Sequence, residues 1–207
     1  FRNSVLLIGA TGVGKTTIAQ SLRRHLPDTK IFQLFSGNSL FFDQIINILS
    51  SAEGEKTLLF MDELFTFEAG HIKYEVENCQ IIGTANDVSY KKFASENPGI
   101  ISRFETVRLE EPSLTEVKEI LTVQQNKLSK QVGLFWEDGF LDELISLSKQ
   151  YLTDQFFPAK GISLLEESAL MTRSQGVSKV TKEILRRIIS EKTAIPIGSL
   201  KVLVKKY

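Results

Sequence analysis

The chain has few of the residues that mark secreted, metal-binding or membrane proteins. Its 207 residues include one cysteine, Cys79, so no internal disulfide can form. The two histidines, His25 and His71, have no metal-ligand spacing with each other or with Cys79, which argues against a structural metal. Cys79 precedes an apolar run, and we interpret it as a small core residue in a reducing compartment, the cytoplasm. No apolar run approaches the roughly 20 residues of a membrane span, so we expect no membrane contact.

An excess of charge of either sign is also missing. Lysine plus arginine and aspartate plus glutamate number 25 each, and the formal net charge is zero. Such a chain has no overall field that attracts nucleic acid or an anionic membrane, so nucleic acid is not an expected partner. A hydrophobic content of 42% in 207 residues is enough for a real core in one large domain or two small ones.

The most informative segment is a glycine-rich loop that fits the phosphate-loop pattern G-x-x-x-x-G-K-[ST]. It follows an expected strand at residues 4–8 and precedes an amphipathic helical pattern at residues 16–22. In such a loop, backbone N–H groups and the helix dipole face phosphate oxygens, Lys15 reaches the β- and γ-phosphates, and the Thr16 hydroxyl can bind Mg²⁺. We therefore predict ATP and Mg²⁺ as cofactors. The predicted nucleotide-binding residues of this loop are Gly9, Ala10, Thr11, Gly12, Val13, Gly14, Lys15, Thr16 and Thr17.

Two carboxylates follow the apolar strand pattern at residues 57–61. Asp62, placed beside the phosphate loop by the end of its strand, can hold Mg²⁺ through water, so Thr16 and Asp62 are the predicted metal-binding residues. Glu63 can then polarise the water that attacks the γ-phosphorus. An apolar strand that simply ends in solvated acids is the alternative, but the phosphate loop upstream favours the catalytic interpretation.

Three further polar residues have predicted roles. Asn86 follows the strand pattern at residues 80–85, and its amide could orient the attacking water or contact the γ-phosphate; Thr84 is the second choice, and a turn-forming role for Asn86 is the alternative. Arg103 precedes the last strand and could enter a neighbouring subunit's site to offset transition-state charge, instead of being a solvated surface residue. Lys160 begins a helix, where a cation opposes the helix dipole, and this placement suggests an anionic ligand.

The order of the patterns predicts an α/β fold with a parallel sheet covered on both faces, followed by helices alone. The division falls where Pro112 discourages further strand and Ser113 with Glu116 makes a capping box. We therefore expect a P-loop α/β ATPase subdomain at residues 1–110 and an all-helical lid subdomain at residues 111–207. The expected strands are at 5–8, 31–35, 57–61, 80–85 and 105–109. The expected helices are at 16–26, 40–50, 90–96, 113–130, 137–150, 160–175 and 181–190.

The ordered set of phosphate loop, paired acids, Asn86, Arg103 and helical lid resembles an AAA+ ATPase module. The lid segment 151–169, YLTDQFFPAKGISLLEESA, is similar to the first nucleotide-binding domain of Clp-type unfoldases and disaggregases, as are the stretches MDEL at 61–64 and FEAG at 67–70. The stretch TAIPI at 193–197 resembles the connector to a second ATPase domain in that family. With Phe1 in place of Met at the start, it leads us to expect a piece of a longer polypeptide.

This resemblance implies Mg²⁺-dependent ATP hydrolysis within a ring-forming, protein-remodelling ATPase. It implies a hexameric homo-oligomer in the full-length parent and protein substrates. It also implies that Arg103 acts in the adjacent subunit's site and that Lys160 reports γ-phosphate occupancy to the lid.

The chain departs from that family in two places that bear on function. Ser102 stands where the family usually has an arginine, which leaves Arg103 alone. The segment 36–43 is shorter than the family's pore loop and lacks its Lys-Tyr-Arg-Gly-like stretch; Phe41 and Phe42 could substitute, although core packing is the simpler explanation, and Tyr74 is a weaker candidate. Two alternatives therefore stay open. One is a nucleotide-gated assembly or scaffold module without polypeptide threading, and the other is a DNA-associated AAA+ ATPase, which the lid and the neutral charge disfavour.

Overall fold

The computed structural model describes residues 4–34, 57–67, 72–73 and 79–200. The chain forms two compact units, Phe1–Glu110 and Glu111–Tyr207. The expected helix at residues 40–50 and the pore-loop candidates Phe41, Phe42 and Tyr74 lie outside the described residues.

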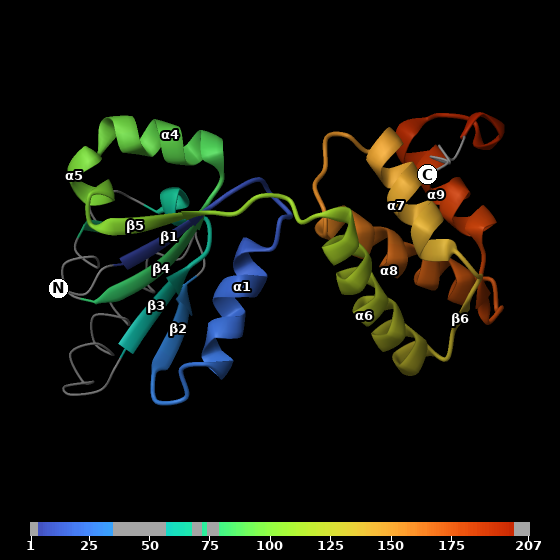
Figure 1. Cartoon of the computed structure of the whole chain (residues 1–207), viewed down its shortest axis with the longest axis horizontal. Coiled ribbons are helices and arrows are strands. Elements are labelled where there is room, and N and C mark those ends of the chain that lie inside the picture. Colours follow the sequence, from blue (N-terminus) through green and yellow to red (C-terminus); the bar gives the residue numbers. More distant parts are fainter. Residues whose placement is uncertain (1–3, 35–56, 68–71, 74–78, 201–207) are drawn as a thin grey trace. The chain divides into compact units, whose positions relative to one another are not determined.

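The first unit is built on a five-stranded parallel sheet with the strand order β2-β3-β4-β1-β5 (Figure 1). Its strands are β1 (Ser4–Ile8), β2 (Lys30–Leu34), β3 (Thr57–Met61), β4 (Gln80–Ala85) and β5 (Phe104–Arg108). Its described helices are α1 (Lys15–Ser21), α4 (Asp87–Glu96) and α5 (Pro98–Ile101), with the 3-10 turns η1 (Leu22–Arg24) and η2 (Leu64–Thr66). The predicted parallel sheet with flanking helices is confirmed, and each strand lies within one residue of its expected bounds.

The inner strands β1, β3 and β4 are buried on both faces, which explains their nearly continuous apolar sequences, whereas the edge strand β5 is exposed beyond Phe104. On one face, Leu6 and Ile8 of β1 belong to a core that includes Phe93 of α4. On the other face, Leu7 belongs to a core that includes Ala19 of α1. Figure 1 shows α1 and α4 on opposite sides of the sheet. Successive side chains of β1 therefore enter different cores, as the two-residue period of a strand requires.

Gly9 is the point at which β1 passes into the phosphate loop. Its N–H donates to the Ala85 carbonyl of β4 at 3.2 Å, and a Cβ at position 9 would lie 2.4 Å from the Leu109 carbonyl oxygen. Any side chain here would push the loop away from the end of β5, so this close approach requires glycine. The loop therefore starts from a fixed point between β4 and β5.

The second unit consists mainly of helices. They are α6 (Leu114–Val132), α7 (Phe140–Tyr151), α8 (Ala159–Ser174) and α9 (Lys182–Thr193), with the 3-10 turn η3 (Ile197–Ser199). The predicted capping box of Ser113 and Glu116 starts α6. The expectation of helices alone was wrong in one detail, because a parallel ladder joins β6 (Phe135–Trp136) to β7 (Lys179–Val180). Strands of two residues show no periodicity that a sequence could reveal.

Candidate nucleotide-binding site

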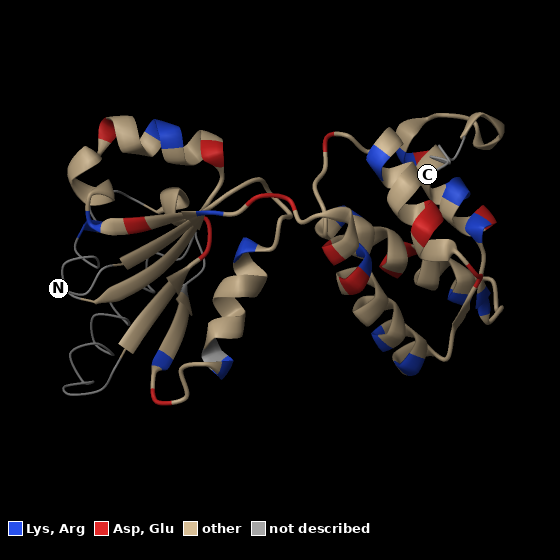
Figure 2. Cartoon of the chain, viewed as in Figure 1, with Lys and Arg blue, Asp and Glu red and all other residues tan. Residues whose placement is uncertain are grey.

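The sheet order brings three loops to one edge. The phosphate loop leaves the carboxyl end of β1, Asp62 and Glu63 leave that of β3, and Asn86 leaves that of β4, which lies between them. Because all the strands are parallel, these ends share one edge of the sheet, where ligands of open α/β sheets bind. Figure 2 shows charged residues of both signs along this edge.

Glycines shape the phosphate loop itself. Gly12 and Gly14 have φ angles of 95° and 103°, and Gly14 is the N-cap of α1. These left-handed values strain any residue with a Cβ, so glycine allows the chain to curl here. Val13 is buried, whereas Thr11 and Thr17 are exposed. The loop thus has a buried inner side and a solvent-facing side.

Lys15 lies across this loop. Its ammonium group donates to the carbonyl oxygens of Gly9 and Ala10, each at 2.8 Å. Burial lowers the pKa of Lys15 from its ordinary value, and the charges of Asp62, Glu63 and Asp87 act in the opposite direction. The cation therefore sits among acids at the edge where the sequence predicted phosphate contact.

Asp62 connects α1 to the two central strands. The Thr16 hydroxyl donates to both carboxylate oxygens of Asp62, at 3.0 and 3.1 Å. The Thr84 hydroxyl donates to Asp62 Oδ1 at 2.5 Å and accepts from the backbone N–H of Glu63 at 2.9 Å. The two predicted metal-binding residues, 46 positions apart in sequence, are thus in direct contact.

These two residues fit a magnesium ion. Within the described ranges no group of three or more histidine, cysteine, aspartate or glutamate side chains could hold a metal. Mg²⁺ needs no such cage, because it commonly binds one or two protein oxygens and takes its remaining ligands from phosphates and water. The adjacent oxygens of Thr16 and Asp62 supply that minimal set.

Glu63 has an unusual backbone. Its φ and ψ are 50° and 55°, in the left-handed region, and its side chain is exposed. Its carbonyl oxygen accepts hydrogen bonds from the backbone N–H and the hydroxyl of Thr66, at 2.9 and 2.8 Å. Non-glycine residues in this region cost about 1–3 kcal/mol and persist where their surroundings over-determine them. The strained turn directs the Glu63 carboxylate away from the core.

Asn86 caps α4, and this fixes which of its atoms can act on a ligand. Its side-chain Oδ1 accepts from the Ser89 N–H at 2.8 Å, so the amide Nδ2 is left as the group that can donate to water or phosphate. Thr84 is fully buried and contacts Asp62 directly. From the sequence, Thr84 is only the second choice after Asn86 for a contact with water or phosphate. The feature that points to Thr84 is a hydroxyl group within an otherwise apolar strand.

Arg103 is not at this edge. It is exposed and directly precedes Phe104, whose backbone pairs with Ser4 at the amino ends of β5 and β1. The phosphate loop lies beyond the opposite, carboxyl ends of these strands. The structure therefore separates Arg103 from the residues gathered around Asp62.

Lys160 belongs to the second unit, where its side chain is buried. Its ammonium group donates to the carbonyl oxygens of Leu152 and Gln155, at 3.1 and 2.9 Å, and lies 4.5 Å from the centre of the Phe157 ring. Burial lowers its pKa, and the charges of Glu111 and Asp154 oppose this. Lys160 also lines a cavity of about 340 Å³. The two carbonyls account for a cation at this helix start, so the predicted nucleotide-sensing role stays a prediction.

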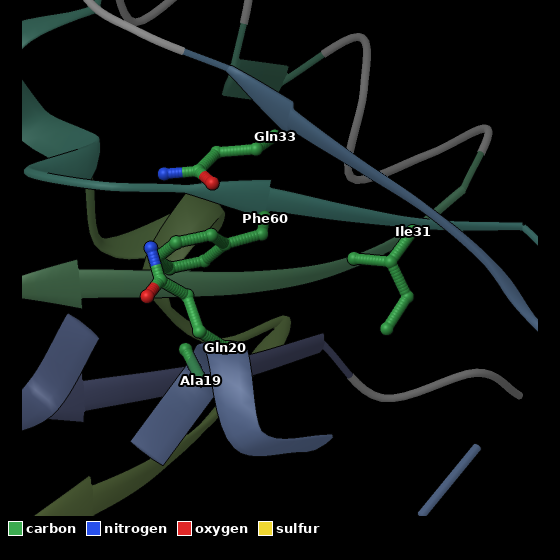
Figure 3. A pocket seen from close by; sticks show the side chains of 5 residues that line it. All are labelled: Ala19, Gln20, Ile31, Gln33 and Phe60. Atoms are coloured by element: carbon green, nitrogen blue, oxygen red, sulfur yellow. The ribbon is translucent and has the colours of Figure 1, made fainter. Parts of the chain in front are cut away.

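Another cavity lies in the first unit, away from the phosphate loop. It measures about 220 Å³ and is formed by α1, β2 and β3 (Figure 3). Its lining residues are Ala19, Gln20, Ile31, Gln33 and Phe60. None of the predicted site residues lines it, so it is distinct from the candidate site.

Comparison with known proteins places the chain in a family. Residues 5–71 match the model of the ATPase family associated with various cellular activities (AAA), and residues 113–196 match that of the AAA lid domain. The chain belongs to the AAA family of ATPases. Nucleotide binding is the general property of this family. None of the helices in the described part of the chain has the length and apolar character needed to cross a bilayer.

Similar proteins show which branch of the AAA family the chain resembles. The chaperone protein ClpB of Bdellovibrio bacteriovorus is 30% identical over 94% of this chain and 27% of its own length. ClpB of Agrobacterium fabrum is 28% identical over 92% of this chain and 26% of its own. The chain is therefore an AAA+ module of the Clp type, as its sequence predicted, and it spans about a quarter of the length of these relatives.

Solved structures show the same fold. The S. cerevisiae Hsp104–casein complex in its extended conformation matches with a TM-score of 0.81 at 22% identity, over 97% of this chain and 40% of the Hsp104 chain. Hsp104 with ATPγS and casein in its closed state has the same TM-score and sequence identity, and the match covers 96% of this chain and 40% of the Hsp104 chain. The chain thus has the AAA+ fold.

Proposed function

We propose that this chain binds ATP and hydrolyses it with Mg²⁺, as a module of a ring-forming, Clp-like protein-remodelling ATPase. The contact network of Thr16, Asp62, Thr84 and Glu63 beside the phosphate loop carries this proposal. A module that only bound nucleotide would need the loop but not an exposed carboxylate held on a strained turn next to it.

Each residue of the network has a distinct task in this proposal. Lys15 and the loop N–H groups hold the phosphates. Mg²⁺ bound by Thr16 and Asp62 would offset charge on the β- and γ-phosphate oxygens. The Glu63 carboxylate takes the proton of the attacking water, and the Asn86 amide donates to that water or to the γ-phosphate.

The ring is supported by where Arg103 lies. An arginine at the amino edge of the sheet is far from the phosphate loop of its own chain but can serve the site of a neighbouring copy. The relatives are named chaperones, and two solved relatives hold casein. We therefore propose two kinds of partner: further copies of the same protein, in a Clp-type ring that is hexameric as the family implies, and protein substrates.

Replacing Glu63 by glutamine tests the catalytic assignment. In the full-length protein, with any other ATPase site inactivated, Glu63→Gln should retain ATP binding and lose turnover by about 10²-fold or more, because general-base catalysis contributes about 10²–10⁴-fold. Lys15→Ala should instead weaken ATP binding by about 10- to 100-fold, the value of a charge-assisted contact of about 1.5–3 kcal/mol.

Phosphate release and titration calorimetry separate the two effects. Glu119→Gln, at an exposed acid of α6, is the matched control and should change neither quantity. Near-normal hydrolysis by Glu63→Gln would remove Glu63 from the role of base, and unchanged affinity in Lys15→Ala would overturn the phosphate-loop assignment.

A further inference from the structure

An arginine, an acid and an aromatic ring meet at the end of the edge strand β5. Arg108 Nη1 lies 2.5 Å from Asp87 Oδ1, and the Arg108 guanidinium carbon lies 5.8 Å from the centre of the Tyr90 ring. Asp87 and Tyr90 are both on α4, one in its first turn and the other three residues later. The guanidinium therefore contacts α4 at two points.

The position of this cluster links it to the candidate site. Arg108 pairs in register with Ile8, the last residue of β1 before the phosphate loop. Asp87 directly follows Asn86, the N-cap of α4. The charge of Asp87 also reaches the phosphate loop: burial is the largest influence on the pKa of Lys15, and Asp87 is one of the acids that oppose it.

The aromatic side of the cluster continues to the turn that carries Glu63. The Tyr90 and Phe65 rings are 6.4 Å apart, and Phe65 stacks on Phe93 at 4.3 Å. Phe65 lies in η2, two residues after Glu63. One connected set of side chains thus joins the end of β5, the start of α4 and the turn after β3.

Stability alone does not explain an ion pair in this place. The side chains of Arg108 and Asp87 are 59% and 44% exposed, and exposed pairs contribute about 0–1 kcal/mol. A pair of this kind can nevertheless select one orientation of a short, solvent-facing first turn. That turn determines where the Asn86 amide lies, because Asn86 is fixed to it through the Ser89 N–H.

We propose that Arg108 is a positioning residue for ATP hydrolysis, which holds the first turn of α4 through Asp87 and Tyr90 and thereby sets the Asn86 amide beside the phosphate loop. The inference rests on the proposed function, since it assigns Arg108 a part in the same reaction. In this proposal Arg108 acts through Asp87 and Tyr90, so its loss should change turnover and not ATP affinity.

Steady-state kinetics in the full-length protein test this, with any other ATPase site inactivated. Arg108→Met keeps an unbranched apolar side chain and removes the guanidinium, and with it the ion pair to Asp87. We expect kcat to fall by about tenfold with KM for ATP within about twofold, since small misplacements of a positioned group cost up to about 10²-fold. Arg108→Lys, which keeps a cation for Asp87, should restore most of kcat.

A double-mutant cycle shows whether Arg108 acts through Asp87. Asp87→Asn should lower kcat by about as much as Arg108→Met, and the double variant should be no worse than either single one, because contacting residues couple. Lys118→Met is the matched control: it breaks an exposed ion pair with Asp142, also 2.5 Å long, in the second unit, and should leave kcat unchanged.

Three results would overturn the inference. They are an unchanged kcat in Arg108→Met, a weaker ATP affinity that matches the loss of turnover, and effects of the two single variants that multiply. Glu63→Gln in the same assay separates the two proposals. If it hydrolyses ATP normally, the proposed function fails; if it is inactive while Arg108→Met is normal, only the role of Arg108 fails.

Discussion

Replacing Thr84 by valine removes one hydroxyl from the centre of the candidate site and leaves the shape of the side chain almost unchanged. This hydroxyl donates to Asp62 Oδ1 at 2.5 Å and accepts from the Glu63 N–H at 2.9 Å. Thr84 is fully buried, so water cannot take over either contact without a shift of β4. The substitution therefore loosens both acids at once.

The expected magnitude follows from the two lost contacts. A hydrogen bond to a charged group is worth about 1.5–3 kcal/mol, and a buried N–H left without a partner costs about 1–3 kcal/mol. If the first of these is lost from the transition state, turnover falls by about 10- to 150-fold, at about 1.4 kcal/mol for each factor of ten. ATP affinity should change by less than about threefold, because Lys15 and the loop backbone are untouched.

Phosphate release, ATP titration and thermal unfolding of the same variants measure this prediction. Thr84→Ser keeps the hydroxyl and should retain most of the turnover. Thr57→Val is the matched control, since the Thr57 hydroxyl is buried in the neighbouring strand and has no hydrogen-bond partner among the described residues. Its replacement should be neutral or stabilising, because it removes a buried polar group that none of the described residues satisfies.

ATP hydrolysis by Thr84→Val at a rate close to that of the unaltered protein would contradict this prediction. An equal loss of turnover in Thr57→Val would also contradict it, because the loss would then come from substitution within the sheet and not from the contacts of Asp62 and Glu63. A loss of ATP affinity equal to the loss of turnover would assign Thr84 to binding.

Two further predictions concern Arg103 and Glu116. Arg103→Ala and Glu63→Gln should each be nearly inactive alone, but oligomers that mix the two variants should regain ATP hydrolysis. The reason is that a Glu63→Gln subunit supplies Arg103 to the site of an Arg103→Ala neighbour, in which Glu63 is intact. No recovery on mixing would contradict the action of Arg103 between subunits. Hydrogen bonds from the Ser113 hydroxyl and backbone N–H lower the pKa of Glu116. The ionised Glu116 carboxylate should therefore stabilise the folded state fully at a pH above the ordinary glutamate pKa of about 4.3. This stabilisation should disappear as the pH falls through the lowered pKa. Denaturant unfolding of the second unit between about pH 2 and pH 6 should therefore lose part of its acid dependence in Glu116→Gln, and identical profiles would refute this.

The local features of this chain were predictable from sequence. The phosphate loop is a contiguous pattern, and the capping box of Ser113 and Glu116 has a fixed spacing. The strands were found because their apolar runs are short and bounded by polar residues. Even the approach of Thr16 to Asp62 followed from a general rule, since parallel strands place their carboxyl ends at one edge.

Other features depend on tertiary packing that no local pattern encodes. The strand order set Thr84 against Asp62, and a sequence of five strands does not reveal that β4 lies between β1 and β3. At the start of α8, the sequence suggested that Lys160 binds an anionic ligand. In the folded chain the buried Lys160 ammonium group donates to two backbone carbonyl oxygens. Arg108 and Asp87 are 21 residues apart and had no pattern to connect them.

The middle strand is what makes the site a single unit. Adjacent strands are about 4.8 Å apart, so about 10 Å separates β1 from β3. The Thr16 hydroxyl nevertheless reaches Asp62 directly, at 3.0 and 3.1 Å, and Thr84 of the strand between β1 and β3 donates to the same carboxylate. The residue that precedes Thr84 on β4 must be small. A Cβ at Gly83 would lie 2.9 Å from Leu64 Cδ2 and 3.1 Å from Leu6 Cδ1. Glycine at position 83 therefore lets the Leu64 side chain pack closely against β4. Because Leu64 directly follows Glu63, this packing holds the strained turn that carries Glu63.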